Sequence, residues 1–412
     1  MKEIHSTAFY NPEYLYLFGL IVYLIRQLPN ETMLLGTHAI FDFVTLLIIG
    51  ACLVPNMIAT IPKYSINFLP LVFISFVVLV IVGINTATLY HQIILFLLVF
   101  GAKGISFRKI VKVYLIIGGG ICMITVLFSQ LGLIPNIIDD YSSREAVLSG
   151  GNAARECLGY KWSTNMSNHV FFIIATFFYY KKGLLNYAEI IIIVAISYWV
   201  LARTDCRLGA LCELLIIIFA LLYRFKLIKN KRNDLFLYKL MTIAIPFFMV
   251  ISYCVVSIYD ESKVIWVVVD VLLSGRLSLS KYPLDKIGIS LMGQEYKMFA
   301  SARDDGANYN FIDNSYMQLL IIYGLIYTIL ICAAYVFISI KAYLRKDYVL
   351  VCTIMIIGVS ALISQHFIEM YMNPFVIALF AKHSHELKLK LKYFRFAYFI
   401  YAYKCGLIVL RR

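Results

Sequence analysis

The sequence predicts an all-α integral membrane protein in which about twelve transmembrane helices form one polytopic domain over residues 1–412. Of the 412 residues, 62% are hydrophobic and only 15% are charged, whereas a soluble domain of this length would expose far more charge. Apolar runs of roughly 20 residues, the length that crosses a bilayer, recur along the chain. Lysine and arginine gather between these runs.

The candidate spans fall into three groups that polar segments separate. The first group precedes a polar segment near 139–165, and the second lies between that segment and a large loop. The third follows the loop, which therefore lies between the ninth and tenth spans. The predicted spans run near 14–28, 33–54, 66–84, 87–100, 109–133, 168–180, 187–202, 207–223, 238–258, 314–340, 348–365 and 372–381.

The distribution of lysine predicts the side of the membrane that each connection faces. If the first span starts in the cytoplasm, every basic cluster falls inside, as the positive-inside rule requires. The tail at 386–412 alternates basic and aromatic residues and is predicted to lie in the inner interface. The clusters lie near 103–112, 181–182, 224–239 and 341–346.

Several arginines fall on the predicted outer side, where that rule disfavours cations. They need another reason to be there, and a guanidinium fork that grips a phosphate is a natural one. Arg203 and Arg207 lie where the seventh span ends and the eighth begins, with Asp205 between them, and Arg155 lies in the preceding outer segment. Snorkelling to lipid headgroups, with Asp205 as a local partner, is the alternative interpretation.

The longest polar interval, 259–313, is predicted to be an outward-facing loop that carries the active site. Within it, the apolar run 264–273 is too short to span the membrane and is predicted to form an interfacial helix. Gly275 would end or bend that run and present Arg276. A solvated loop arginine is the alternative for Arg276.

Two further pairs of polar residues border predicted spans on the outer side. Asp313 and Asn314 precede the tenth span, where they could cap the helix, and Asp313 could also act as general base toward a sugar hydroxyl. His366 and Glu369 lie three apart at the outer end of the eleventh span, on one face if the helix continues. Both are predicted to contribute to the same outer cavity.

Other classes of chemistry find little support in the sequence. The net charge of +14 comes from short clusters rather than one continuous basic face, so no nucleic-acid partner is expected. The cysteines lie mostly in apolar segments without paired spacing, which predicts neither disulfides nor a metal site. No phosphate-binding loop or dinucleotide fingerprint occurs, so no cofactor is expected. The N-terminus shows no pattern of a cleavable signal peptide.

Ionisable residues inside predicted spans keep a transporter open as an alternative. His38 and Asp42 lie four apart in the second span, and Glu213 lies in the eighth. Such groups usually face a polar interior and can form a proton relay. They are few, however, and the large outer loop is not a feature that a transporter requires.

A series of short motifs between 158 and 375 resembles the Wzy-type O-antigen polymerases and the related O-antigen ligases. The resemblance depends on the order of the motifs and on their predicted side of the membrane, with the large loop late in the chain. The motifs are Leu158-Gly159-Tyr160, the stretch from Arg203 to Arg207, Leu273-Ser274-Gly275-Arg276, Gly293, Asp313-Asn314-Ser315-Tyr316 and Tyr323-Gly324.

The resemblance implies a metal-independent glycosyltransferase on the outer face of the bacterial inner membrane. It would take a glycan from an undecaprenyl-pyrophosphate donor and join it to an acceptor hydroxyl, with membrane lipid around it and a chain-length regulator as a further partner. Arg207 and Arg276 would neutralise the departing pyrophosphate, and Asp313 would take the acceptor proton. The expected substrate contacts are Arg203, Arg155, Asn314, His366 and Glu369.

Three activities remain distinguishable at this point. A polymerase would add the glycan to another lipid-linked repeat unit, whereas a ligase would add it to lipid A–core. Ligases carry a histidine at the position that Asp313 occupies here, which favours polymerase. A flippase for lipid-linked glycans is the third alternative.

Overall fold

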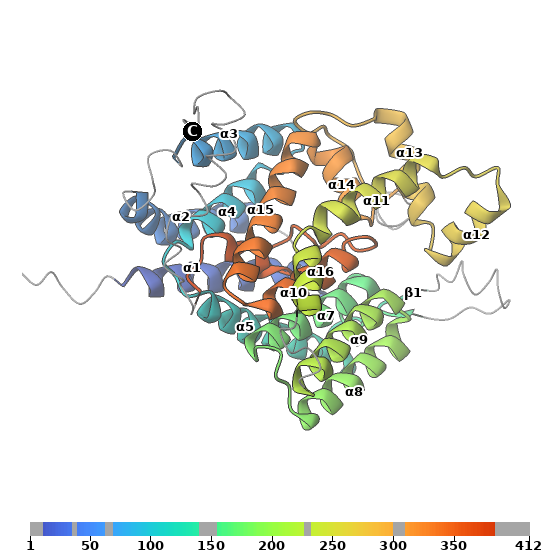
Figure 1. Cartoon of the computed structure of the whole chain (residues 1–412), viewed down its shortest axis with the longest axis horizontal. Coiled ribbons are helices and arrows are strands. Elements are labelled where there is room, and N and C mark those ends of the chain that lie inside the picture. The colour runs from blue at the N-terminus through green and yellow to red at the C-terminus, as the bar shows by residue number, and fades with distance from the viewer. Residues whose placement is uncertain are drawn as a thin grey trace, which may run out of the picture.

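The computed structural model describes residues 11–34, 39–61, 69–139, 155–225, 232–299 and 310–383. Within these ranges the protein is all-α, apart from two short strands that pair with each other (Figure 1). The predicted tail 386–412 and His38 lie outside the described residues. So does part of the large loop, from 300 to 309.

The N-terminal helices begin and end at recognisable signals. Asn11 caps the first helix by accepting a hydrogen bond from the backbone N–H of Glu13 at 3.0 Å, and Pro12 occupies the first helical position, where its missing N–H costs nothing. This part of the chain contains α1 (Pro12–Gln27), η1 (Leu28–Glu31), α2 (Ala39–Thr60), α3 (Leu69–Asn85), α4 (Leu89–Gly101) and α5 (Phe107–Gln130).

Three helices in the middle of the chain pack side by side and hold one wall of the site. They are α7 (Ser163–Tyr180), α8 (Tyr187–Thr204) and α9 (Arg207–Arg224), and α7 also packs against α5. A capping box between Asn186 and Glu189 starts α8. Strands β1 (Ile138–Asp139) and β2 (Arg155–Glu156) pair antiparallel, with Asp139 opposite Arg155.

The C-terminal half supplies the other walls. It contains α10 (Arg232–Met241), α11 (Ala244–Ile258), α12 (Val264–Leu272), α13 (Arg276–Ile287), α14 (Ser315–Gln318), the π-helical turn η4 (Leu319–Tyr323), α15 (Leu325–Leu344), α16 (Tyr348–Ser360) and η5 (Pro374–Leu379). Figure 1 shows α12 and α13, in yellow, at one edge of the molecule. They confirm that the predicted interfacial run is a helix followed by a bend.

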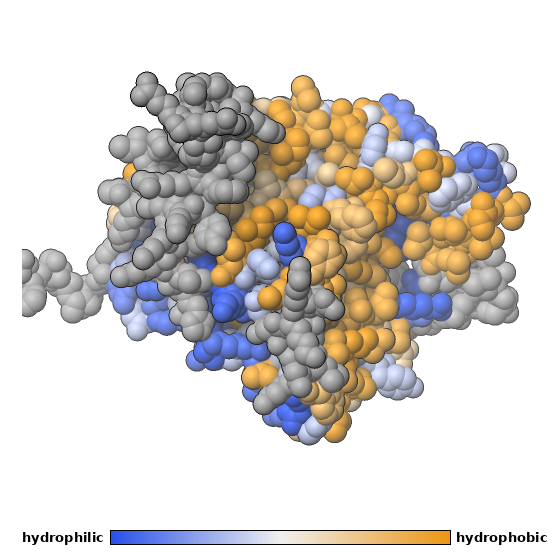
Figure 2. All heavy atoms as spheres, viewed as in Figure 1, coloured by the Kyte–Doolittle hydropathy of each residue, from blue (hydrophilic) through white to orange (hydrophobic). Residues whose placement is uncertain are grey.

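Several long apolar helices indicate a multi-pass membrane protein. Among the described residues, four helices are long and apolar enough to cross a membrane: α2 from Ile40 onward, α5, α8 and α15. Helices α10 and α11 meet at a bend of 53° and would make a fifth span if taken together. Many large apolar side chains are exposed, and Figure 2 shows broad hydrophobic areas on the face in view.

The structure corrects two of the predicted spans near the C-terminus. The segment predicted to span at 372–381 contains only the six-residue 3₁₀ helix η5, which is about 12 Å long and cannot cross a bilayer. Its side chains are apolar because they are buried against α4, α5 and α15. The span predicted at 348–365 is helical only to Ser360, and residues 361–373 continue as irregular chain.

Candidate functional site

Asp205 organises the arginines between α8 and α9. It ends α8 in a left-handed conformation, with φ of 48°, which turns the chain so that Arg207 begins α9. Its carboxylate accepts from Arg207 Nε at 3.2 Å and from Arg155 Nη2 at 3.2 Å. Arg203 Nη2 instead pairs with Glu156 at 2.6 Å. The alternative interpretation, with Asp205 as local partner of these arginines, is confirmed for Arg207, whereas Arg203 pairs with Glu156 and Arg155 from β2 joins Asp205.

Arg276 is packed into the protein rather than solvated. Ser274 and Gly275 have φ of 58° and 76°, so the chain reverses between α12 and α13 and directs Arg276 inward. Its Nε donates to the carbonyl of Ile363 at 3.0 Å, and its Nη2 lies 3.5 Å from Asp313 Oδ2. The Arg276 side chain is only 16% exposed. The alternative of a solvated loop arginine is therefore wrong.

Asp270 fixes the start of α13, and sequence reasoning missed it. Its Oδ1 accepts from the backbone N–H groups of Leu277 at 2.8 Å and Ser278 at 3.3 Å. A carboxylate at the N-terminus of a helix satisfies donors that have no partner within the helix. An acidic residue inside the apolar run 264–273 was the available signal.

The capping role expected of Asp313-Asn314 belongs to Asn314. Its Oδ1 accepts from the N–H groups of Tyr316 at 3.0 Å and Met317 at 3.2 Å, and its Nδ2 donates to Ser252 Oγ at 2.7 Å. Asn314 is buried, so it holds α14 against α11. Asp313, the residue before it, faces Arg276 instead.

A cavity of about 360 Å³ brings together five of the eight predicted site residues. Its walls come from the start of α7, the α8–α9 turn, the α12–α13 turn and the segment after α16. Three predicted residues do not line the cavity: Arg203, Asn314 and Glu369. They are bonded instead to Glu156, Ser252 and His366, respectively. The five predicted residues in the lining are Arg155, Arg207, Arg276, Asp313 and His366.

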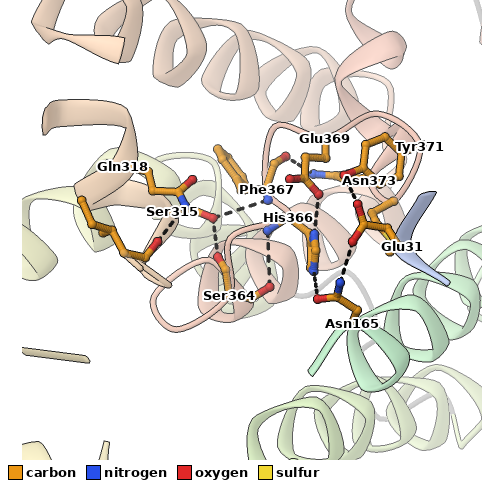
Figure 3. A network of polar contacts seen from close by, with 12 residues as sticks. Glu31, Asn165, Ser315, Gln318, Ser364, His366, Phe367, Glu369, Tyr371 and Asn373 are labelled. Atoms are coloured by element: carbon orange, nitrogen blue, oxygen red, sulfur yellow. Dashed lines mark hydrogen bonds and ion pairs between the residues drawn. The ribbon is translucent and has the colours of Figure 1, made fainter. Parts of the chain in front are cut away.

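His366 reaches this cavity from a network of buried hydrogen bonds (Figure 3). Its Nδ1 is bonded to a Glu369 carboxylate oxygen, and its Nε2 lies 3.3 Å from Asn165 Oδ1 on α7. Asn165 Nδ2 donates to Glu31 Oε2 at 2.5 Å, and the Tyr371 hydroxyl donates to Glu31 Oε1 at 3.0 Å. The helix does not continue as far as His366, so the condition for a shared helical face is not met, and the contact between His366 and Glu369 forms in irregular chain.

Two members of the network have pKa values above their usual range. Burial acts to lower the pKa of His366, but the carboxylates of Glu369, Glu31 and Asp313 outweigh it, so the pKa is raised. Burial raises the pKa of Glu31, and the Glu369 carboxylate raises it further against the opposing effect of His366. Each group thus holds its proton at a higher pH than in water.

The motif Leu158-Gly159-Tyr160 explains how Glu31 comes to face α7. Gly159, with φ of 83°, has no room for a side chain: a Cβ there would lie 2.9 Å from the carbonyl oxygen of Thr125. Its own carbonyl accepts from Met33 N at 2.8 Å, and Lys161 N donates to the Glu31 carbonyl at 3.0 Å. These bonds fasten η1 beside the start of α7. No local pattern around Glu31 signals this contact.

Serine and asparagine side chains hold the irregular segment 361–373 in place. Ser315 Oγ donates to the carbonyl of Ser364 and accepts from the N–H of Phe367 at 3.4 Å. Asn373 Nδ2 donates to the Phe367 carbonyl at 2.6 Å. These bonds satisfy backbone groups that a helix would have paired internally. They hold in place the segment that carries His366 (Figure 3).

The opposite end of the same helices carries a second cavity of about 240 Å³ with a basic lining. Helix α7, about 27 Å long, has its first turns at the site cavity and its last residues, Tyr179 and Tyr180, at the second one. The cations around the second cavity are Arg108, Lys182, Arg345 and Lys346.

Among the described residues, no group of three or more His, Cys, Asp or Glu side chains is arranged to hold a metal ion. Comparison of the chain with models of protein families, with curated proteins and with solved structures finds no match.

Proposed function

We propose that this protein is a polymerase of lipid-linked oligosaccharide repeat units, working on the outer face of the cytoplasmic membrane with undecaprenyl pyrophosphate as the leaving group. The observation that carries the proposal is the convergence of Arg155, Arg207 and Arg276 on one cavity. These arginines come from β2, α9 and α13. Guanidinium groups gathered at a helix-bundle end are suited to a pyrophosphate.

The cavity has both a cationic wall and a proton acceptor. Its arginines are matched by only two aspartates in the lining, Asp205 and Asp313. Asp205 accepts hydrogen bonds from the guanidinium groups of Arg207 and Arg155, so its role is to position these two arginines. Asp313 lies beside Arg276, where an acceptor hydroxyl and a leaving phosphate would meet.

The reaction needs only these groups. The acceptor oxygen attacks the anomeric carbon of the donor sugar, the bond from that carbon to the pyrophosphate oxygen breaks, and the acceptor proton passes to Asp313. Arg207 and Arg276 stabilise the negative charge that develops on the departing pyrophosphate. The products are a glycan one repeat unit longer and undecaprenyl pyrophosphate.

The positions of the two cavities support an outward-facing site. Lysine and arginine at the second cavity match the cytoplasmic side by the positive-inside rule, so the site cavity at the other end of α7 would face outward. The proposal keeps the membrane crossings predicted from the sequence except the corrected one at 372–381. The short apolar helices α3, α4 and α16 would supply some of these crossings within the bundle.

Ligation to lipid A–core remains the second candidate, because it uses the same donor and leaving group. Asp313 in the place of the ligase histidine favours polymerisation. A transporter is less well supported by the ionisable residues that suggested it. Asp42 on α2 pairs with Arg26 at 3.0 Å, and Glu213 is buried on α9, outside the lining of the site cavity.

A gel of surface polysaccharide tests the proposal. Cells that lack the gene would be complemented with wild type, Arg276→Ala or Asp313→Asn at equal expression. A polymerase leaves a single repeat unit on the core in the deletion strain, and only the wild type restores the ladder. Polymer that accumulates on its lipid carrier without reaching the core would indicate a ligase, and an unchanged ladder in the deletion strain would refute both.

A further inference from the structure

The orientation of Asn165 can be assigned from its partners. Glu31 Oε2 lies 2.5 Å from one terminal atom of the Asn165 amide, and an ionised carboxylate can only accept, so with Glu31 ionised that atom is the amide nitrogen. The amide oxygen therefore faces His366 Nε2, at 3.3 Å. At His366 Nδ1 the neighbour is the Glu369 carboxylate, again an acceptor. Both ring nitrogens of His366 thus face acceptors, and only an imidazolium donates from both.

We propose that Glu31 is a positioning residue that, through Asn165, keeps His366 as an imidazolium and so makes it the fourth cation of the site cavity. This inference rests on the proposed function, because it assigns the cation to the pyrophosphate. Glu31 lies on η1 and is bonded to α7 through Asn165 and to the 361–373 segment through Tyr371. It touches no substrate itself.

The positive charge of His366 matters because it changes the net charge of the cavity lining. Three arginines face two aspartates, which leaves one positive charge in the lining. An imidazolium raises that surplus to two, which matches the two negative charges of the pyrophosphate diester in the bound donor. His366 is buried, with 1% of its side chain exposed, so its charge is weakly screened by water.

A second arrangement contains the same number of protons. If the proton moved from His366 to Glu31, the Asn165 amide would turn over, its nitrogen would face a neutral imidazole and its oxygen would accept from a protonated Glu31. Rotation of Asn165 and the charge of His366 are therefore coupled. The ionised arrangement keeps Glu31 as acceptor toward both Asn165 and the Tyr371 hydroxyl, as the structure has it.

Several elements contribute charged or titratable groups around His366 and its cavity, and these set the background for its titration. The 361–373 segment supplies Glu369 and Tyr371, and α7 supplies His169, whose ring is held by the Tyr160 hydroxyl. The remaining groups are Glu31, Lys161, Asp313, Arg276, Arg155, Asp205 and Arg207.

Two substitutions with opposite expected effects test the inference. Full-length protein in lipid nanodiscs, with its histidines labelled with ¹⁵N, reports the His366 titration by NMR, and His366→Gln assigns the signal. Glu31→Gln removes one carboxylate and is expected to move the midpoint of His366 down by about one pH unit. Asn165→Asp places a carboxylate directly against Nε2 and is expected to move it up by a similar amount. Mere loss of packing would not move it in both directions.

Binding of inorganic pyrophosphate, measured by calorimetry on the same samples, provides the second readout. Pyrophosphate itself also titrates with pH, and dividing the wild-type affinity by the Glu31→Gln affinity at each pH cancels that effect. From the expected shift of about one pH unit in the His366 midpoint, this ratio should rise roughly several-fold between pH 6 and pH 8. Glu13→Gln is the matched control. Glu13 lies on α1, its Oε2 is 2.5 Å from Lys109 Nζ, and it does not line the cavity.

The outcomes separate the inference from the proposed function. Wild-type protein that binds no pyrophosphate while the His366 midpoint still shifts would refute the phosphate site and leave the role of Glu31 intact. An unshifted midpoint in Glu31→Gln, in protein that keeps its thermal stability, would overturn the inference. So would a pyrophosphate affinity that loses the same factor at every pH.

Discussion

At the scale of single residues, Arg276 is the cation with the most specific placement. It bonds the Ile363 carbonyl and lies beside Asp313, so it joins the loop to the segment that carries His366. If the proposed function holds, we expect Arg276→Ala to lower the rate of chain elongation about 10²- to 10³-fold, as the loss of one preorganised hydrogen-bond donor does in known enzymes. Steady-state kinetics on lipid-linked oligosaccharide would measure it.

The control for this prediction is Lys263→Ala, a loop cation that pairs with Asp260 at 3.2 Å and does not line the cavity. Its activity is expected to match the wild type. Equal losses for the two variants would mean that Arg276 acts only through the general charge of the loop.

Asp313 and Asn314 are adjacent but are predicted to fail in different ways. Asp313→Asn keeps the shape of the side chain and the cap on α14, so we expect activity to fall about 10²- to 10⁴-fold with little change in melting temperature. Asn314→Ala removes the cap and the bond to Ser252, and is expected to cost about 1–2 kcal/mol of stability. Thermal unfolding and kinetics on both variants distinguish these roles. A loss of stability in Asp313→Asn with a loss of activity alone in Asn314→Ala would contradict the assignment of Asp313 as the base.

At the scale of elements, the turn between η4 and α15 depends on Gly324. Its φ of 87° and ψ of 169° belong to a region that almost only glycine occupies, and a Cβ would lie 2.5 Å from the backbone nitrogen of Gly293. We expect Gly324→Ala to destabilise the protein by more than about 3 kcal/mol, since strain and overlap add. Thermal unfolding in detergent would measure the loss.

Gly119 in α5 is the matched control, because nothing lies within 4 Å of its hypothetical Cβ and it is an interior helical residue. Gly119→Ala is expected to be neutral or to stabilise the protein by up to about 1 kcal/mol. A similar effect of the two substitutions would mean that the close approach of Gly324 and Gly293 is unimportant.

The site residues show what local sequence can and cannot provide. Arg155, Arg207, Arg276, Asp313 and His366 were predictable because isolated polar groups beside apolar runs are costly and need a reason. Glu31 was not predictable, since its partner Asn165 is 134 residues away and one sequence carries no signal of such pairing.

The helices show a similar division. Long apolar runs such as α5 and α15 were found because their length and composition suffice. The run at 372–381 was misread because burial in a protein core and burial in lipid demand the same apolar residues. Only the packing of η5 against α4, α5 and α15 separates the two.

At the scale of the whole molecule, the two cavities predict opposite membrane faces. Glu261 lies in the exposed turn before α12 and Lys182 is exposed at the far end of α7. We expect a membrane-impermeant maleimide to label Glu261→Cys in spheroplasts and Lys182→Cys only after permeabilisation, with wild type as the baseline for native cysteines. Labelling of Lys182→Cys in intact spheroplasts would contradict the predicted orientation.

We propose that this one protein joins repeat units on their lipid carrier. The most direct test supplies purified protein in nanodiscs with the lipid-linked oligosaccharide that accumulates in the deletion strain, and follows both glycan length and released undecaprenyl pyrophosphate. We predict a ladder of lipid-linked chains with one carrier released for each unit added, and elongation about 10²- to 10³-fold slower with Arg276→Ala. Glycans that stay at one unit beside active wild-type protein, or a variant that elongates as fast as the wild type, would contradict it.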